Sequence, residues 1–325
     1  MKRWMRKASL LFGTGLALSL LVACGESLSG SQSSGDGDDD AATGEWPETI
    51  VYGVLPTEDT EELMSSYAPF EEYMSSCLDN PFELFTGTDY TAMIEAMRTG
   101  NLHISKFGPF SYILASERAG AEAMVQPVDD SGEPTYTSMI VTLESYGFES
   151  VADLEGEPFA FVDATSTSGY LFPRAMMLEE IGLGPDEIDD WLGNVVFSGG
   201  HDASAIAVLN GDVKAAAISS NLWHKGVVEN GDFDSHQNID DLVILAETDA
   251  IPRTVEAIQG DLPDDLKEQA KACFESSLDE PSLNDFFFED SNTAGGYVSA
   301  TDDAFDIVRS TAETLGVSPD DLLED

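Results

Sequence analysis

The stretch FAFVDATSTSGYLFP, residues 159–173, decides the fold. Its first four residues are apolar and predict a buried strand over 159–162. Pro173 is tolerated only in the first turn of a helix, so a helix must begin close to Gly169 or Tyr170. The serines and threonines between the two elements then lie at the N-terminus of this helix. A strand, a short loop and a helix in this order are the unit from which α/β proteins are built.

A second stretch, NVVFSGGHDASAIAVLNG at residues 194–211, has the same order of elements. It predicts a strand over 194–198, a glycine turn, and a helix over about 203–209 that ends at Gly211.

Further elements alternate in the same way on both sides of these stretches. We expect strands over 50–55, 82–86, 102–106, 137–143, 213–219 and 242–246. We expect helices over about 58–76, from Thr88 to Gly100, and from about Phe110 onward. The sequence contains no repeat of fixed period. The alternation predicts an α/β fold with a mixed or parallel sheet.

Three of the expected loops, 87–90, 164–169 and 198–202, lead from a strand into a helix. In open α/β sheets, ligands bind beyond the carboxyl ends of the strands, beside helix N-termini. Ser166, Thr167, Ser168 and Gly169 bring three hydroxyls and several backbone N–H groups to one such place. This composition is typical of an anion site. The alternative interpretation is ordinary N-capping, which needs only one Ser or Thr.

The third loop contains the pair His201 and Asp202. A surface histidine and a plain N-capping aspartate are the alternative interpretation. Near an anion, His201 donates to an oxygen, and Asp202 accepts from an oxygen that carries a proton. Such a pair favours a protonated phosphorus oxyanion over sulfate, which carries no proton at neutral pH and would face an unpaired acceptor. Tyr90 and Tyr112 are candidate phenol donors, although tyrosines in such positions also serve only in packing.

The amino terminus has the organisation of an export signal. Its basic cluster, Lys2, Arg3, Arg6 and Lys7, precedes an apolar run over 8–23 that is short for a membrane-spanning helix. The run ends in LVACG, which resembles the lipobox of bacterial lipoproteins, with Cys24 as the acylated first residue of the mature chain. A signal anchor that is never cleaved is the alternative. The Ser-, Gly- and Asp-rich segment that follows, up to residue 46, predicts a flexible linker.

Composition limits the classes of function. The 325 residues carry a net charge of −48 and are 42% hydrophobic, so the chain has enough apolar residues for a core and no basic surface for nucleic acid. Removal of residues 1–23 takes away four basic residues and would leave a net charge of −52. Salt screens such a charge and keeps the protein soluble, so a saline or alkaline habitat is favoured over a cationic ligand as the reason for it. Cys77 and Cys273 remain, either as one disulfide or as two buried thiols.

Several fragments together resemble the PhnD-like family of phosphate, phosphite and phosphonate substrate-binding proteins of ABC importers. They are VYGVLPTE at 51–58, TDY at 88–90, FGPFSY at 107–112, YTSMIVT at 136–142, DLEGEPFAFVDATSTSGYLFP at 153–173, SGGHDASAIAVLNGDV at 198–213 and YVSATDDAFDIVRSTAETLG at 297–316. The resemblance covers about residues 48–316, and its specific part is STSGY followed downstream by GGHDAS.

The resemblance implies an α/β, two-lobed periplasmic-binding-protein fold of type II, whose lobes are joined by a two-strand hinge. Lobe I would comprise residues 47–141 and 249–325, and lobe II residues 142–248. The hinge crossings would lie near 138–146 and 242–252.

The resemblance also implies which residues surround the phosphorus oxyanion. These are Tyr90, Ser166, Thr167, Ser168 and His201, with Gly169, Asp202 and Tyr112 completing the candidate set. Two positions depart from the family pattern: Arg253 follows Ile251 and Pro252 where an acidic residue is frequent, and Lys214 replaces another acidic residue. Recognition of an aminoalkyl group is therefore not expected, and a smaller ligand such as phosphite, methylphosphonate or phosphate is favoured.

The expected function is that of a monomeric, lipid-anchored, extracytoplasmic protein that delivers a phosphorus oxyanion to an ABC permease without a cofactor. Alternatives are a binding protein for another small anion and a sensory or accessory lipoprotein. A hydrolase is disfavoured because the chain has no G-x-S-x-G elbow and adjacent His and Asp orient each other poorly. A metal site is disfavoured because the four histidines, at 103, 201, 224 and 236, form no ligand motif.

Overall fold

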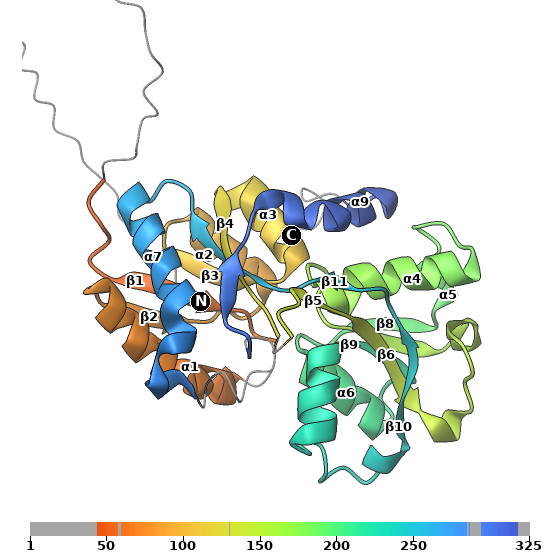
Figure 1. The fold of residues 1–325 in the computed structure, drawn as a ribbon. Coiled ribbons are helices and arrows are strands. Elements are labelled where there is room, and N and C mark those ends of the chain that lie inside the picture. Colours follow the sequence, from red (N-terminus) through yellow and green to blue (C-terminus); the bar gives the residue numbers. More distant parts are fainter. Residues whose placement is uncertain (1–43, 58–59, 130, 285, 287–293, 318–325) are drawn as a thin grey trace, which may run out of the picture. The chain divides into compact units, whose positions relative to one another are not determined.

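The computed structural model describes residues 44–57, 60–129, 131–284, 286 and 294–317 (Figure 1). The expected signal segment, Cys24 and the linker up to residue 43 lie outside these residues. Within the described ranges, we find no helix with the length and apolar character needed to cross a membrane.

The first of two large sheets has the strand order β13-β4-β12-β3-β1-β2. Its strands are β1 (Ile50–Val54), β2 (Phe82–Phe85), β3 (Ile104–Phe107), β4 (Ala121–Pro127), β12 (Val255–Gln259) and β13 (Tyr297–Ser299). The parallel part, β1 with β2 and β3, consists of strands that the sequence predicts. The antiparallel part, β12 with β3 and β4 and then β13 with β4, was not predicted from the sequence.

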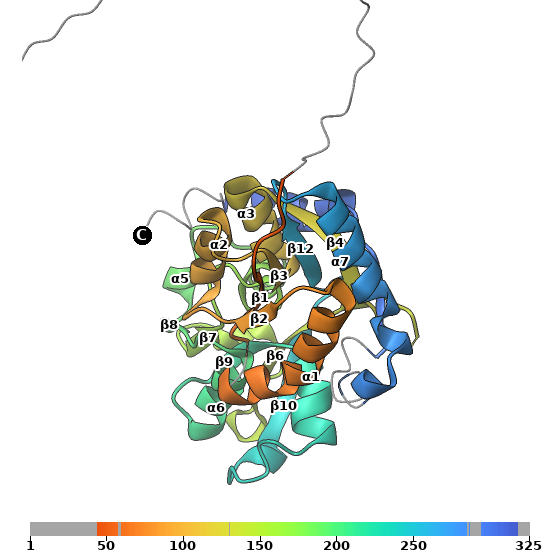
Figure 2. The ribbon, with the colours of Figure 1, turned by 90° about the vertical axis from the view of Figure 1, so that its left-hand side faces the viewer.

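Helices cover both faces of this sheet. They are α1 (Thr60–Leu78), α2 (Tyr90–Arg98), α3 (Pro109–Ala119), α7 (Asp264–Ser276) and α9 (Asp306–Thr314). On one face, α1 and α7 pack against one another and against β1, with Tyr52, Phe70 and Phe274 in one buried cluster (Figures 1 and 2). On the other face, α2 and α3 supply Met93 and Phe110 to a second cluster. Burial of each of these large side chains stabilises the folded state by about 1.5–3 kcal/mol.

A disulfide joins the two helices of the first face. Cys77 near the end of α1 and Cys273 in α7 have their sulfurs 2.05 Å apart and their Cα atoms 6.0 Å apart. The bond closes a loop of 196 residues. Of the two possibilities that the sequence left open for these cysteines, the structure therefore shows the disulfide.

The second large sheet has the strand order β10-β6-β9-β7-β8. Its elements are β6 (Ser138–Leu143), β7 (Pro158–Phe161), β8 (Asn194–Phe197), β9 (Ala215–Ser219) and β10 (Leu242–Glu247), with helices α4 (Phe172–Ile181), α5 (Ile188–Trp191) and α6 (His201–Asn210). All five strands were predicted, with ends that differ by up to two residues. β7 runs parallel to β8 and β9, whereas β6 runs antiparallel to β9 and β10, so the sheet is mixed.

The hydroxyl-rich loop after β7 enters its helix through a π-helical turn, Thr167–Leu171, before α4 begins at Phe172. Pro173 lies in the first turn of α4, as its missing N–H requires. A second π-helical turn spans Leu222–Glu229, and short 3₁₀ turns span Glu144–Tyr146, Val151–Leu154, Ile239–Asp241, Ser277–Asp279, Pro281–Leu283 and Asp302–Phe305.

A small antiparallel sheet of β5 (Thr135–Tyr136) and β11 (Ile251–Pro252) lies where the chain passes between the two large sheets. These passages occupy residues 128–137 and 248–254, because β4 and β12 belong to one large sheet and β6 and β10 to the other. The first expected crossing, 138–146, was misplaced, because its first six residues form β6 and are all buried in the second sheet. The expected boundary at 141/142 thus falls inside β6, and the division into lobes at those residues stays a prediction.

Candidate functional site

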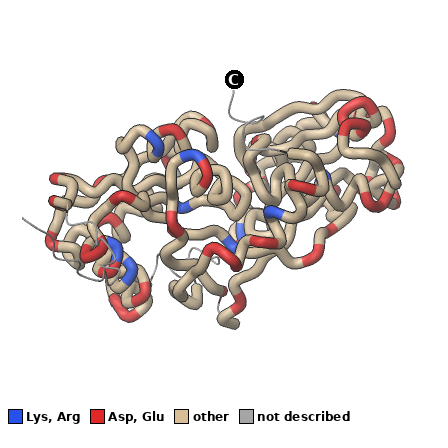
Figure 3. Tube along the Cα trace, turned by 90° about the horizontal axis from the view of Figure 1, so that it is seen from above, with Lys and Arg blue, Asp and Glu red and all other residues tan. Residues whose placement is uncertain are grey.

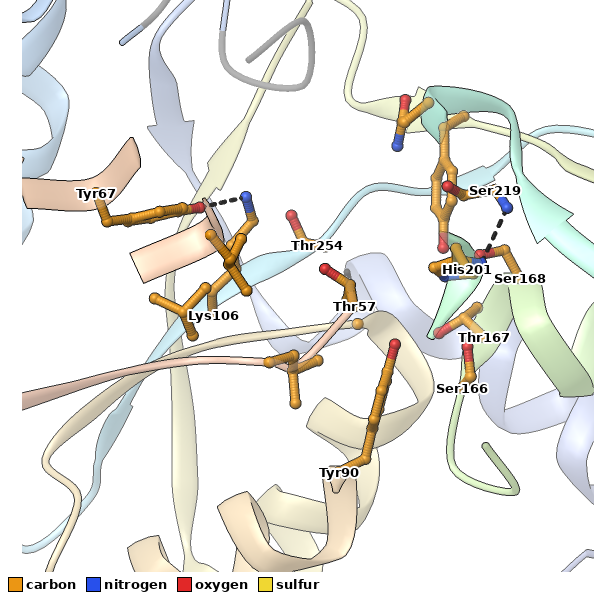
Figure 4. A pocket seen from close by; sticks show the side chains of 16 residues that line it. Thr57, Tyr67, Tyr90, Lys106, Ser166, Thr167, Ser168, His201, Ser219 and Thr254 are labelled. Atoms are coloured by element: carbon orange, nitrogen blue, oxygen red, sulfur yellow. Dashed lines mark hydrogen bonds between the residues drawn. The ribbon is translucent and has the colours of Figure 1, made fainter. Parts of the chain in front are cut away.

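A small cavity of about 90 Å³ lies between residues of the two large sheets (Figure 4). A cavity of about 10–15 Å³ already holds one water molecule, so this one has room for a small ligand. Its lining comprises Val54, Leu55, Thr57, Leu63, Tyr67, Tyr90, Lys106, Gly108, Tyr136, Ser166, Thr167, Ser168, His201, Ser219, Asn221 and Thr254.

Two hydroxyl groups of this lining have their acceptor side engaged by backbone amides. The Oγ of Ser166 accepts a hydrogen bond from the N–H of Gly169 at 3.1 Å. The Oγ1 of Thr167 accepts one from the N–H of Phe110, in the first turn of α3, at 2.9 Å. Each hydroxyl keeps its own proton to donate. The loop after β7 therefore presents O–H donors to the cavity.

Tyr136 of β5 adds a phenol to this group of hydroxyls. Its side chain hydrogen-bonds Ser168 and Thr167, and burial nevertheless raises the pKa of Tyr136 to about 12. The phenol therefore keeps its proton at neutral pH. The backbone oxygen of Ser168 accepts from the Oγ of Ser138 at 2.5 Å, which ties the loop to β6.

His201, the first residue of α6, is a neutral donor. The backbone N–H of Ser219 donates to its Nδ1 at 3.1 Å, which is drawn in Figure 4. A ring nitrogen that accepts a hydrogen bond carries no proton, so the proton of the neutral ring is on Nε2. Burial lowers the pKa of His201 to about 4, since a charged imidazole would lose its hydration. At neutral pH the ring thus offers one N–H and no formal charge.

Three lining residues come from loops at the carboxyl ends of strands in the first sheet. Thr57 follows β1, Tyr90 begins α2 after β2, and Gly108 lies between β3 and α3. The backbone oxygen of Thr57 accepts from the N–H of His201 at 2.8 Å. The cavity therefore lies where carboxyl-terminal loops of both sheets meet, which is where open α/β sheets bind ligands.

The cavity also contains one cation among its described lining residues. Lys106 of β3 donates from Nζ to the hydroxyl of Tyr67 at 2.8 Å, and its Nζ lies 5.5 Å from the centroid of that ring. No described residue of the lining is Asp or Glu. In the described part of the chain, no group of three or more His, Cys, Asp and Glu side chains could hold a metal ion. The arrangement fits an anion rather than a cation.

Five of the eight candidate binding residues line this cavity: Tyr90, Ser166, Thr167, Ser168 and His201. Asp202 does not. The helix α6 begins one residue before it, with Gly200 as N-cap, and successive residues of a helix point about 100° apart. The Oδ1 of Asp202 instead accepts from the N–H of Ala203 at 2.7 Å.

Tyr112 and Gly169 also do not line the cavity. The hydroxyl of Tyr112 donates to Asp302 at 2.8 Å, and its ring packs 4.9 Å from that of Phe305. Burial and the Asp302 carboxylate raise the pKa of Tyr112 to about 12. Gly169 contributes to the site indirectly, because its N–H donates a hydrogen bond to the Ser166 hydroxyl.

Sequence reasoning missed several lining residues, including Tyr67, Lys106, Tyr136 and Thr254. The sequence does contain an indication for Lys106, because a charged residue in the short apolar strand ISKF needs a polar partner or a ligand. Tyr136 and Thr254 carried no such indication, because both lie two residues outside the expected crossings, 138–146 and 242–252.

The model of a family described as the periplasmic substrate-binding protein of phosphonate ABC transporters matches residues 52–305, more than half of the chain. A curated relative, the phosphate-import protein PhnD of Mycolicibacterium smegmatis, is 27% identical over an alignment 311 positions long that covers 92% of this chain and 96% of the relative.

Two solved structures share the fold. One is a binding-protein component of an ABC phosphonate transporter from Pseudomonas aeruginosa, with a TM-score of 0.72, 22% identity, and coverage of 86% of this chain and 95% of that one. The other is PhnD1 from Prochlorococcus marinus in complex with methylphosphonate, with a TM-score of 0.73, 19% identity, and coverage of 83% and 99%. They confirm the two-lobed type II fold class. The chain belongs to the family of periplasmic substrate-binding proteins of phosphonate ABC transporters.

Proposed function

We propose that the chain binds a small phosphorus oxyanion in the cavity between its two large sheets and delivers it to an ABC permease. The observation that carries the proposal is the set of oriented donors. The hydroxyls of Ser166 and Thr167 have their acceptor sides engaged by amides, and the Nδ1 of His201 accepts from Ser219. The protons of the Ser166 hydroxyl and of the His201 Nε2 are left for a ligand, and the Thr167 hydroxyl is shared with Tyr136. As a member of this family, the chain is a binding protein and not an enzyme.

The ligand class follows from the donors and from the relatives. The Mycolicibacterium smegmatis relative is named for phosphate import, and PhnD1 of Prochlorococcus marinus was solved with methylphosphonate. Hydrogen bonds to a charged oxygen contribute about 1.5–3 kcal/mol each, so a few convergent donors suffice for tight binding. We assign phosphate, phosphite and phosphonates as the candidates for this chain.

Discrimination against sulfate needs another origin than Asp202, which lies outside the lining. Hydroxyl groups both donate and accept, so Ser168 or Tyr136 is able to accept from a protonated ligand oxygen. Sulfate offers no such proton at neutral pH and leaves the acceptor unpaired. Loss of that bond costs about 1–3 kcal/mol.

The proposal includes anchoring of the mature chain to the outer face of the cell membrane through acylated Cys24, with the segment up to residue 46 as the linker. Its support is the lipobox-like sequence LVACG and the basic cluster before it. Asp and Glu greatly outnumber Lys and Arg along the described chain (Figure 3). This charge slows the approach of an anion at low salt and is screened at high salt.

The direct test is calorimetric titration in high salt of the chain from residue 24 onward, with Cys24→Ser. The ligands are phosphate, phosphite, methylphosphonate, 2-aminoethylphosphonate and sulfate. We expect saturable binding of at least one of the first three and none of sulfate. The variant Asp202→Asn should retain this discrimination, because the Asp202 carboxylate is not in the lining. Silence across all five ligands would refute the proposal.

We expect His201→Ala to weaken binding of the preferred oxyanion by about 10–150-fold, the equivalent of one charge-assisted hydrogen bond. Because burial holds the pKa of His201 at about 4, the ring is neutral from about pH 6 to about pH 8. The ratio of the two dissociation constants, wild type against variant, should therefore stay constant over this range. Protonation of the ligand changes both dissociation constants by the same factor, so it does not affect their ratio.

A ratio that rises as the pH falls through 6.5 would mean that the ring binds the ligand as a cation. The low pKa of His201 also makes the free energy of unfolding depend on pH. Between about 6.5 and about 4 the unfolded chain takes up the proton more readily than the folded protein. The stabilisation that neutral His201 gives above pH 6.5 is thus lost as the pH falls toward 4, and chemical denaturation at several pH values measures this loss.

A further inference from the structure

We infer that Arg253, which does not line the cavity, is a positioning residue for the ligand. It holds the amide oxygen of Asn221, and the amide NH₂ group of Asn221 is thereby presented to the cavity as a further donor to the oxyanion. The inference rests on the proposed function. It adds to the candidate set one binding residue, Asn221, and one residue that acts through it.

Arg253 is held in place from several sides between the two passages. Its backbone N–H donates to the oxygen of Pro134 at 2.8 Å, and its Nε donates to the oxygen of Glu133 at 3.2 Å. Its Nη2 lies 3.1 Å from the Oδ2 of Asp129 in an ion pair, and its side chain is only 8% exposed. A planar guanidinium group that is held at several atoms has little freedom to rotate. The direction of its Nη1 is therefore set by residues outside the cavity.

The contact between Arg253 and Asn221 decides how the Asn221 amide is turned. The Nη1 of Arg253 lies 3.4 Å from the Oδ1 of Asn221. A guanidinium group has five N–H donors and no acceptor, so only the amide oxygen is able to face it. The Nδ2 group, with its two protons, then points away from Arg253. Asn221 is partly buried and lines the cavity, and its Nδ2 has no hydrogen-bond partner among the described residues.

A donor that is turned in this way suits an oxyanion and not an amine. Ser166 and His201 offer a proton to the cavity for the same reason, since a backbone amide engages the acceptor atom of each side chain. An oxygen of phosphate, phosphite or methylphosphonate accepts from the Asn221 amide. An alkylammonium group has donors only, so it would find no acceptor at this NH₂ group. The contact with Arg253 therefore also favours ligands without an amine.

A purely structural role for Arg253 makes a different prediction. Its partners Asp129, Glu133 and Pro134 precede β5, and Arg253 follows β11, so it ties the two passages to one another. Loss of these contacts would loosen the passages and weaken binding by the same factor whether or not the Asn221 amide is present. Loss of a positioning contact weakens binding only while the amide is present.

The test is a double-mutant cycle, measured by calorimetric titration in high salt of the chain from residue 24 onward, with Cys24→Ser. The ligands are phosphate, phosphite and methylphosphonate. We expect Asn221→Leu to weaken binding of the preferred one by about 10–150-fold, the equivalent of one charge-assisted hydrogen bond. Arg253→Met should weaken it at least about threefold more in the wild-type background than in the Asn221→Leu background, because residues in contact couple.

Two controls separate this effect from a loss of folding. Asn221→Ala removes the amide without adding apolar bulk and should weaken binding as Asn221→Leu does. Arg174→Met removes another buried arginine, whose side chain is 7% exposed and pairs with Asp189 at 2.7 Å outside the cavity. This variant should lower the midpoint of urea denaturation and keep the affinity within about twofold of the wild type.

The inference is overturned if both Asn221 variants bind like the wild type, or if Arg253→Met has the same effect in both backgrounds. The first result would mean that the amide does not touch the ligand, and the second would leave Arg253 with the structural role alone. In either case the wild type still binds an oxyanion and the proposed function stands. If the wild type binds none of the three ligands, the proposed function has failed and the inference fails with it.

Discussion

Replacement of both Cys77 and Cys273 by serine is expected to lower the free energy of unfolding by about 2–5 kcal/mol. The bond joins residues 196 apart, so it removes a large part of the conformational freedom of the unfolded chain. The loss should appear as a lower midpoint in urea denaturation followed by tryptophan fluorescence. The expected cost approaches the total stability of a marginal protein.

The same variant should keep its affinity for the oxyanion at temperatures where it is folded. Neither cysteine lines the cavity, and the bond ties α1 to α7 on a face of the first sheet. Denaturation of the wild-type protein with and without a reductant is the matched control, because it breaks the same bond without a substitution. A variant as stable as the wild type, or a wild type insensitive to reduction under denaturing conditions, would contradict the expectation.

Much of the fold is visible in local sequence patterns. β7, β8 and β9 are short, mostly apolar runs, and such runs predict strands; β7 and β9 are largely buried, whereas β8 at the sheet edge is partly exposed. The helix stops at Gly182 and Gly211 are residues in the left-handed region, which glycine adopts without strain. The loops that follow β2, β7 and β8 supply Tyr90, Ser166 to Ser168 and His201 to the cavity, because strand–loop–helix units place such loops at one edge of a sheet.

The rest depends on contacts between distant parts of the chain. β12 pairs antiparallel with β3 although about 150 residues separate them, and no local pattern encodes that pairing. The position of the passages between the sheets follows from it, and so does the presence of Tyr136 and Thr254 in the cavity. Asp202 shows that a local pattern also has limits. Neighbouring residues of a helix point in different directions, so the exact start of α6 decides whether His201 or Asp202 faces the cavity.

Gly169→Ala is expected to damage the site although Gly169 does not line it. A Cβ at this position would lie 2.4 Å from the Cβ of Val162 and 2.8 Å from the Oγ of Ser166. Real side chains do not approach so closely, so the loop must move away from the end of β7. Overpacking of this kind costs about 1–3 kcal/mol of stability.

The more informative effect of Gly169→Ala should be a weaker affinity for the oxyanion. The N–H of Gly169 holds the Ser166 hydroxyl, and its backbone oxygen accepts from the N–H of Val162 at 3.0 Å. A shift of the loop therefore moves the donors of Ser166 and Thr167 together, and functional geometry tolerates displacements of only about 0.5 Å. We expect binding of the preferred oxyanion to weaken by about 10–150-fold, the equivalent of one charge-assisted hydrogen bond.

A matched control is Gly184→Ala, outside the site. There the added Cβ would meet only the side chain of Glu187, whose carboxylate at 3.1 Å is the movable end of a flexible residue. This variant should bind with wild-type affinity. Isothermal titration and urea denaturation of both variants separate the two effects. If Gly169→Ala binds as tightly as Gly184→Ala, the hydroxyls of this loop do not set the affinity. The donors would then have to come from the other lining residues, with His201 and Tyr136 first among them.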